Sequence, residues 1–113
     1  MTPVLAPVRS VVIVGFGLIG ASVAMAVRAR DPSVRLVAID QPGVVKLSEV
    51  QDRVDSALAV TSVAPVNETL AAADLVLMAA PVHVIEQQLP NVLSHARCTT
   101  DCGSTKRRIV EAA

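Results

Sequence analysis

Three glycines near the start of the chain have the spacing of a loop that binds phosphate groups. Residues 15–20 read Gly-Phe-Gly-Leu-Ile-Gly and directly follow a β-branched run at 11–14. In such a loop the first glycine permits a tight turn, the second leaves room for a pyrophosphate, and the third lets a helix pack closely on the strand. The N–H groups at the start of that helix then face the phosphates. We therefore expect dinucleotide contacts from Gly15, Phe16, Gly17, Leu18, Ile19 and Gly20.

Asp40 ends the next apolar run, twenty residues beyond Gly20. A carboxylate at that position accepts hydrogen bonds from the adenosine ribose hydroxyls, and its charge repels the 2′-phosphate of NADP. No arginine stands at 41 or 42 to bind such a phosphate. The pattern favours NAD as the cofactor. The alternative is a glycine-rich turn in a fold that binds nothing, with Asp40 merely solvated.

A second polar group, Asp-Cys-Gly-Ser-Thr-Lys, occupies residues 101–106. Ser104 stands at the start of an expected helix, where it either caps that helix or offers its hydroxyl to a ligand in the crevice, and spacing alone favours the cap. His83 follows the fourth expected strand and is a weaker candidate for proton transfer, because a bare histidine in such a loop is usually a surface or capping group. We find no pattern of a metal site, a Ser-His-Asp set or a P-loop, so no metal is expected.

Strands that alternate with helices position these residues. The sequence predicts strands at 10–14, 34–40, around 59–61, 75–79 and 97–101, with helices at 18–30, 44–51, 67–73 and 82–93. A turn is expected at 41–43, an N-cap at Asn67, and an interruption of the fourth helix at Pro90. This alternation predicts an α/β fold, a Rossmann-type doubly wound parallel sheet of strand order 3-2-1-4-5. We expect one dinucleotide-binding domain over 1–113, its sheet incomplete at the C-terminal end.

Composition excludes several other classes of protein. Ten basic and ten acidic residues cancel, and the chain has one Phe with no Tyr or Trp, which argues against nucleic acid as a partner. The charge-free run at 11–27 is read as a buried strand and helix rather than as a signal peptide or membrane span. Cys98 and Cys102, about 13 Å apart in an extended segment, are expected to be reduced core thiols. A cytoplasmic location follows from these expectations.

Several of these motifs together resemble one family. The combination of Gly-Leu-Ile-Gly-Ala-Ser at 17–22, Asp40, the stretch 72–82 and Asp-Cys-Gly-Ser-Thr-Lys at 101–106 is similar to the N-terminal NAD-binding domain of prephenate and arogenate dehydrogenases. The resemblance covers nearly the whole chain. Pro81, within the stretch 72–82, is counted with the expected cofactor contacts.

The resemblance implies oxidative decarboxylation of prephenate or arogenate in tyrosine biosynthesis, with hydride passing to the nicotinamide. It also implies that Ser104 is catalytic and bonds the ring hydroxyl of the substrate. In the family a histidine takes the hydroxyl proton, and a helical domain completes the substrate site and the homodimer. Both lie beyond the region matched here, and neither His83 nor His95 matches the catalytic position, so this chain alone is expected to be inactive.

Two alternatives stay open on the sequence alone. The chain could be the cofactor domain of another hydroxyacid or imino acid dehydrogenase, although residues 101–106 argue against those groups. It could also be a stand-alone NAD-binding module without catalysis. Whether the natural chain continues past Ala113, and whether prephenate or arogenate is the substrate, is not decided by these residues.

Overall fold

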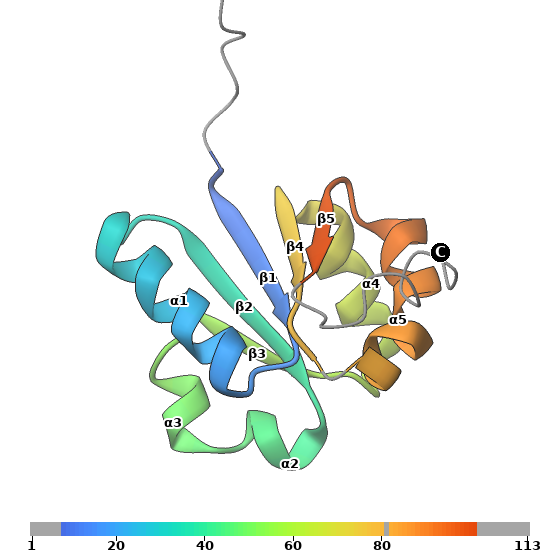
Figure 1. Cartoon of the computed structure of the whole chain (residues 1–113), viewed down its shortest axis with the longest axis horizontal. Helices are drawn as coiled ribbons and strands as arrows, with labels where there is room; N and C mark the ends of the chain where they lie inside the picture. Colours follow the sequence, from blue (N-terminus) through green and yellow to red (C-terminus); the bar gives the residue numbers. More distant parts are fainter. Residues whose placement is uncertain (1–7, 81, 102–113) are drawn as a thin grey trace, which may run out of the picture.

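A parallel sheet of five strands forms the centre of the molecule (Figure 1). The computed structural model describes residues 8–80 and 82–101, and of residues 82–86, 89 and 101 the backbone alone. The strands are β1 (Ser10–Val14), β2 (Arg35–Asp40), β3 (Ser56–Ala59), β4 (Leu75–Met78) and β5 (Thr99–Asp101). Their order is β3-β2-β1-β4-β5, and every neighbouring pair is parallel. The predicted α/β fold and strand order are confirmed.

Helices cover both faces of the sheet, so its central strands are apolar on both sides. One face packs against α1 (Leu18–Arg30), α2 (Pro42–Val45) and α3 (Ser48–Gln51), and the other against α4 (Val63–Ala72) and α5 (Val82–His95). In β1, Ile13 points into the first layer and Val12 into the second, and both are fully buried. This two-sided burial explains why the sequence shows continuous Val and Ile runs instead of alternation.

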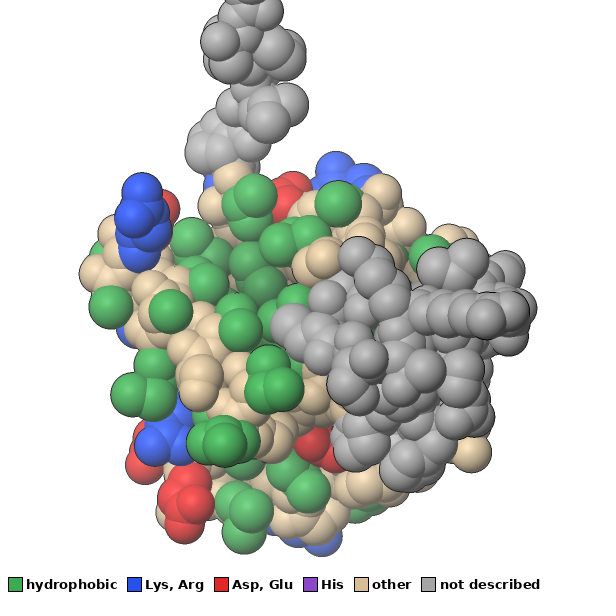
Figure 2. Space-filling model, in the orientation of Figure 1, with side chains coloured by type: hydrophobic (Ala, Val, Ile, Leu, Met, Phe, Trp, Pro, Cys, Tyr) green, Lys and Arg blue, Asp and Glu red, His purple; other side chains and the backbone are tan. Residues whose placement is uncertain are grey.

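Helix α1 buries small residues most completely. Gly20 and Ala24 are buried, Val23 and Val27 are half-buried, and Ile19 and Ala26 are exposed. Small residues face the sheet because the helix lies close to β1. Figure 2 shows hydrophobic side chains at the surface in the middle of the face seen in Figure 1.

Three boundaries differ from those predicted. Pro42, predicted to lie in a turn, begins α2, since a proline at the first position of a helix gives up no hydrogen bond. The third strand is Ser56–Ala59 and ends before the predicted centre. Helix α4 begins at Val63, so Asn67 lies inside it and is not an N-cap; its side-chain oxygen accepts a hydrogen bond of 3.1 Å from the Asn91 amide of α5.

Two further expectations near the end of the described chain are wrong. Pro90 does not interrupt α5, which continues to His95 because the turn after the proline packs into the core, where Val92 is 2% exposed. Cys98 is a free thiol but is exposed and does not belong to the core. Its partner in that expectation, Cys102, lies outside the described residues. Within the described part of the chain, no helix is long and apolar enough to cross a membrane.

Two aspartates accept hydrogen bonds from backbone N–H groups near the starts of β1 and β2. The Asp74 carboxylate accepts hydrogen bonds from the N–H groups of Arg9 (2.8 Å) and Ser10 (3.2 Å) and pairs with Arg97 at 2.9 Å. These bonds, that of Arg9 above all, lower the pKa of Asp74 below its ordinary value of 3.8. The Asp55 carboxylate accepts a 2.7 Å bond from the Leu36 N–H, which, with the hydrogen bond from Arg28, lowers its pKa as well.

Candidate functional site

The carboxyl ends of four strands are joined by backbone hydrogen bonds just beyond the sheet. Gly15 N–H donates to the Ile39 carbonyl, Val60 N–H to the Asp40 carbonyl, and Ala79 N–H to the Val14 carbonyl, each at 2.8 Å. The loops after β1, β2, β3 and β4 therefore start from fixed positions along one edge. In an open parallel sheet this edge is where ligands bind.

The three glycines of the loop differ in what surrounds them. Gly15 has a φ of +90°, a left-handed conformation, and a Cβ there would lie 2.6 Å from the backbone of Ala80. A Cβ on Gly20 would collide with the Gly15 carbonyl oxygen and lie 3.1 Å from Ile13. Around Gly17, by contrast, no atom of the described residues lies within 4 Å of such a Cβ. The first and third glycines are thus required by the protein's own packing, while the second faces open space.

Helix α1 begins directly after that open position. Gly17 is its N-cap residue, and within the described part of the chain no side chain caps the first turn by a hydrogen bond. The first N–H groups of a helix have no partner within the helix and carry the positive end of its dipole. Because Gly17 adds no side chain in front of them, these groups are accessible to an anion such as a phosphate.

The Asp40 carboxylate lies against the glycine-rich loop. One of its oxygens accepts a hydrogen bond from the Phe16 N–H at 2.7 Å, and the other accepts one from the Gln41 N–H at 2.7 Å. A carboxylate has about four acceptor positions. Two of them therefore stay available to hydroxyl groups of a ligand.

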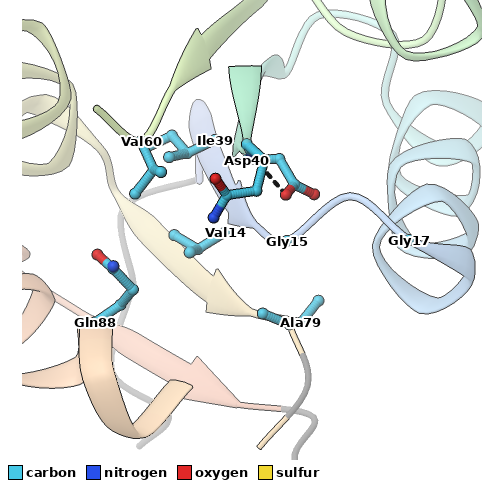
Figure 3. Close-up of a pocket in the computed structure, with 10 residues that line it drawn as sticks. Val14, Gly15, Gly17, Ile39, Asp40, Val60, Ala79 and Gln88 are labelled. Carbon is cyan, nitrogen blue, oxygen red and sulfur yellow. Dashed lines mark hydrogen bonds between the residues drawn. The ribbon is translucent and has the colours of Figure 1, made fainter. Parts of the chain in front are cut away.

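These elements enclose a pocket of about 180 Å³ (Figure 3). Gly17 lies at one end, Val60 and Gln88 lie at the other, and Asp40 lies between them. Most of the remaining wall is apolar, from Val14, Ile39, Ala79 and Ala80. The pocket thus contacts residues that follow β1, β2, β3 and β4, and it carries its polar groups at separate points along its length.

The structure brings together part of the residues predicted to form the site. Gly15, Gly17 and Asp40 line the pocket. Phe16 contributes its N–H, while its side chain is buried in the core; Leu18 and Ile19 begin α1 with exposed side chains. Pro81 and Ser104 lie outside the described residues, and of His83 only the backbone is described. Among the residues described, no group of three His, Cys, Asp or Glu side chains could hold a metal ion.

Sequence reasoning missed Val60 and Gln88. Val60 was missed because the third strand was predicted around 59–61, which placed Val60 inside the strand, whereas β3 ends at Ala59. Gln88 had a signal: it stands three residues after Ile85 and four before Val92, which places a polar residue on the apolar stripe of its helix. A polar residue on such a stripe is a reason to look for a ligand.

Comparison with known proteins agrees with this geometry. No family model matches the chain. Two curated relatives do, the prephenate dehydrogenases of Bacillus subtilis (31% identical, 92% of this chain) and Lactococcus lactis (28% identical, 93% of this chain). The chain matches the N-terminal domain of prephenate dehydrogenases. The chain spans 28% and 29% of the lengths of these two relatives.

Solved structures agree with this match. A putative prephenate dehydrogenase from Corynebacterium glutamicum superposes with a TM-score of 0.69 at 29% identity, over 92% of this chain and 32% of its own. The prephenate dehydrogenase from A. aeolicus, solved with hydroxyphenyl propionate and NAD+, gives a TM-score of 0.75 at 20% identity, over 95% of this chain and 39% of its own. The likeness to the A. aeolicus structure supports the fold. The likeness to the C. glutamicum structure also supports the resemblance inferred from the motifs.

Proposed function

We propose that this chain is the NAD-binding domain of a prephenate or arogenate dehydrogenase. The observation that carries the proposal is the pairing of an open, uncapped helix start at Gly17 with the Asp40 carboxylate in one pocket. The first suits a pyrophosphate, and the second suits the two hydroxyls of an adenosine ribose. The similarity to prephenate dehydrogenases, one of them solved with NAD+, supports the same cofactor.

The described residues would hold the cofactor rather than react with it. Bound NAD supplies the hydride acceptor of the reaction. The first turn of α1 orients the phosphates, Asp40 fixes the adenosine ribose, and the backbone bonds at the ends of β1, β2 and β4 keep these groups in place. Rigid placement of the cofactor is the main contribution of such a domain to rate, because it removes the entropy cost of orienting the reactants.

The catalytic part of the proposal rests on the motif at 101–106 alone. We assign Ser104 to the active site, hydrogen-bonded to the ring hydroxyl of the substrate, by its similarity to the family pattern. Prephenate or arogenate as substrate, a homodimer and a cytoplasmic location belong to the same proposal. Residues 1–113 are taken as the cofactor domain, because the relatives are more than three times as long.

Titration calorimetry with NAD tests the cofactor assignment directly. We expect a single site per chain, and we expect NAD at a hundred times its Kd to stabilise the domain by about 2.7 kcal/mol. Thermal unfolding with and without NAD measures that shift independently. Absence of both heat and stabilisation would contradict the proposal, and the fold would then stand without a bound dinucleotide.

A further inference from the structure

We propose that Gln88 recognises the base of the bound dinucleotide and selects adenine over its 6-oxo analogue. This inference rests on the proposed NAD site and names a specificity residue within it. It starts from the order of groups along the pocket. Gly17 lies at the helix start that suits phosphates, and Asp40, next along the pocket, suits the ribose (Figure 3). A nucleotide that extends in this order reaches the end formed by Val60 and Gln88 with its base.

The walls at that end suit a flat aromatic ring. Val60 is held beside Asp40 by the hydrogen bond from its N–H to the Asp40 carbonyl at 2.8 Å. Ile39 is buried, lines the pocket and lies next to Val60 (Figure 3). Such apolar surfaces contact the faces of a base but cannot distinguish one purine from another. Discrimination requires a polar group at the edge of the ring.

Gln88 supplies that group from the opposite side of the pocket. It is half-buried on α5, and within the described part of the chain its amide has no hydrogen-bond partner. Gln41, which also lines the pocket, is exposed and follows Asp40 directly, so it lies at the ribose. Gln88 is therefore the half-buried amide at the base end of the pocket.

A glutamine amide complements adenine and not hypoxanthine. Its oxygen accepts from the N6 amino group of adenine while its nitrogen donates to N7, the pairing by which glutamine recognises adenine in nucleic acids. Hypoxanthine presents two acceptors, O6 and N7, at the same edge. The amide oxygen of Gln88 then faces a second acceptor and makes no hydrogen bond there. A lysine at this position donates to both acceptors, as it does with guanine.

Calorimetry with NAD and with the analogue in which hypoxanthine replaces adenine tests this role. The wild-type chain should bind NAD at least about fivefold more tightly than the analogue. Gln88→Ala should bring the two Kd values within about twofold of each other, and Gln88→Lys should reverse the preference. Gln87→Ala, the exposed neighbour on the same helix, is the matched control and should keep the wild-type ratio.

The possible results separate this inference from the proposed function. If NAD binds in a manner that Gly17→Val abolishes, but Gln88→Ala keeps the wild-type ratio, the role of Gln88 is wrong and the NAD site stands. Loss of discrimination in Gln41→Ala instead of Gln88→Ala would overturn the inference in the same way. If the wild-type chain binds neither dinucleotide, both the inference and the proposed function fail.

Discussion

The Asp40 carboxylate connects two turns, so a change at this residue affects more than the charge of the site. It accepts the N–H of Phe16 in the glycine-rich loop and the N–H of Gln41 after β2. Removing it leaves the Phe16 N–H without its acceptor. The loop that carries Gly17 would then be held less firmly, and the phosphates as well as the ribose would be bound less well.

We expect the wild-type chain to bind NAD at least tenfold more tightly than NADP, a difference of about 1.4 kcal/mol. Asp40→Ser should narrow that gap by relieving repulsion of the 2′-phosphate, and it should also weaken NAD binding because the loop loses its acceptor. Calorimetry with both cofactors measures the two effects. Asp52→Ser, at an exposed carboxylate away from the pocket, is the control. Equal affinities in the wild type would remove Asp40 from its proposed role.

Replacing Gly15 should mainly reduce the stability of the fold, whereas replacing Gly17 should mainly reduce NAD binding. Gly15→Ala forces a side chain into a left-handed conformation and against Ala80, so it should destabilise the fold by at least about 1–3 kcal/mol. Gly17→Val meets no atom of the described residues and should cost at most about 1 kcal/mol as a poorer N-cap, but it should abolish NAD binding.

Thermal unfolding and calorimetry on the two glycine variants separate stability from binding. Gly43→Val adds the same side chain at another exposed glycine with open surroundings and should leave NAD affinity unchanged. A folded Gly17→Val protein with wild-type NAD affinity would show that the pyrophosphate does not approach this residue.

At the scale of the elements, carboxylates near the strand starts fix the positions of neighbouring strands by directed hydrogen bonds, which apolar burial does not supply. Asp74 stands between α4 and β4 and binds two N–H groups at the start of β1, which fixes where these two strands begin relative to each other. The carboxylate must be ionised to bind both N–H groups and Arg97 well. Part of the stability of the sheet is therefore linked to pH.

Stability should fall as the pH drops from about 4 through the lowered pKa of Asp74. A carboxyl whose folded pKa lies below its unfolded pKa stabilises fully above the unfolded value, and its contribution disappears once both states are protonated. Asp74→Asn should lower the thermal midpoint at neutral pH and differ little from the wild type near pH 2. Asp52→Asn is the control and should differ little at either pH. A difference in thermal midpoint between Asp74→Asn and wild type that stays the same at both pH values would contradict the link between Asp74 ionisation and stability.

The strands and their order were predictable because their signal is local and strong. β1, β2 and β4 contain continuous apolar runs that end at a glycine, an aspartate or an alanine, which is typical of strands buried on both faces. Gly15 and Asp40 were found because each marks a strand end. The short third strand, Ser-Ala-Leu-Ala, has weak β propensity and is half-buried, so its position depends on pairing with β2.

The end of the pocket formed by Val60 and Gln88 could not be predicted for a related reason. Val60 and Gln88 are distant in sequence and meet at the pocket only because β3 pairs with β2 and α5 returns across the opposite face. Pro90 was misjudged in the same way, since tertiary packing of Val92 overrides the local preference against proline in a helix. Local chemistry thus pointed to the residues that we propose to contact phosphate and ribose, while the other lining residues of the pocket depend on long-range packing.

At the scale of the whole molecule, the chain spans less than a third of the length of its curated relatives. The described residues line a pocket at one edge of the sheet, which we propose as the cofactor site. A hydride transfer requires the substrate to be held against the nicotinamide, and proton removal from the ring hydroxyl requires a positioned base. We therefore expect the proposed reaction to require groups beyond those that the structure describes.

We expect the 113-residue chain to bind NAD but to show no measurable NADH formation with prephenate or arogenate. A positioned base contributes about 10²–10⁴-fold and orientation of the reactants more, so loss of both should remove detectable turnover. In a longer protein that contains this domain, Ser104→Ala should lower kcat with NAD affinity nearly unchanged, whereas Thr105→Ala should change neither quantity by much. Absorbance at the NADH band measures turnover in both proteins. Rapid turnover by the 113-residue chain would mean that the catalytic groups lie within it, and His83→Gln would then be the first variant to measure.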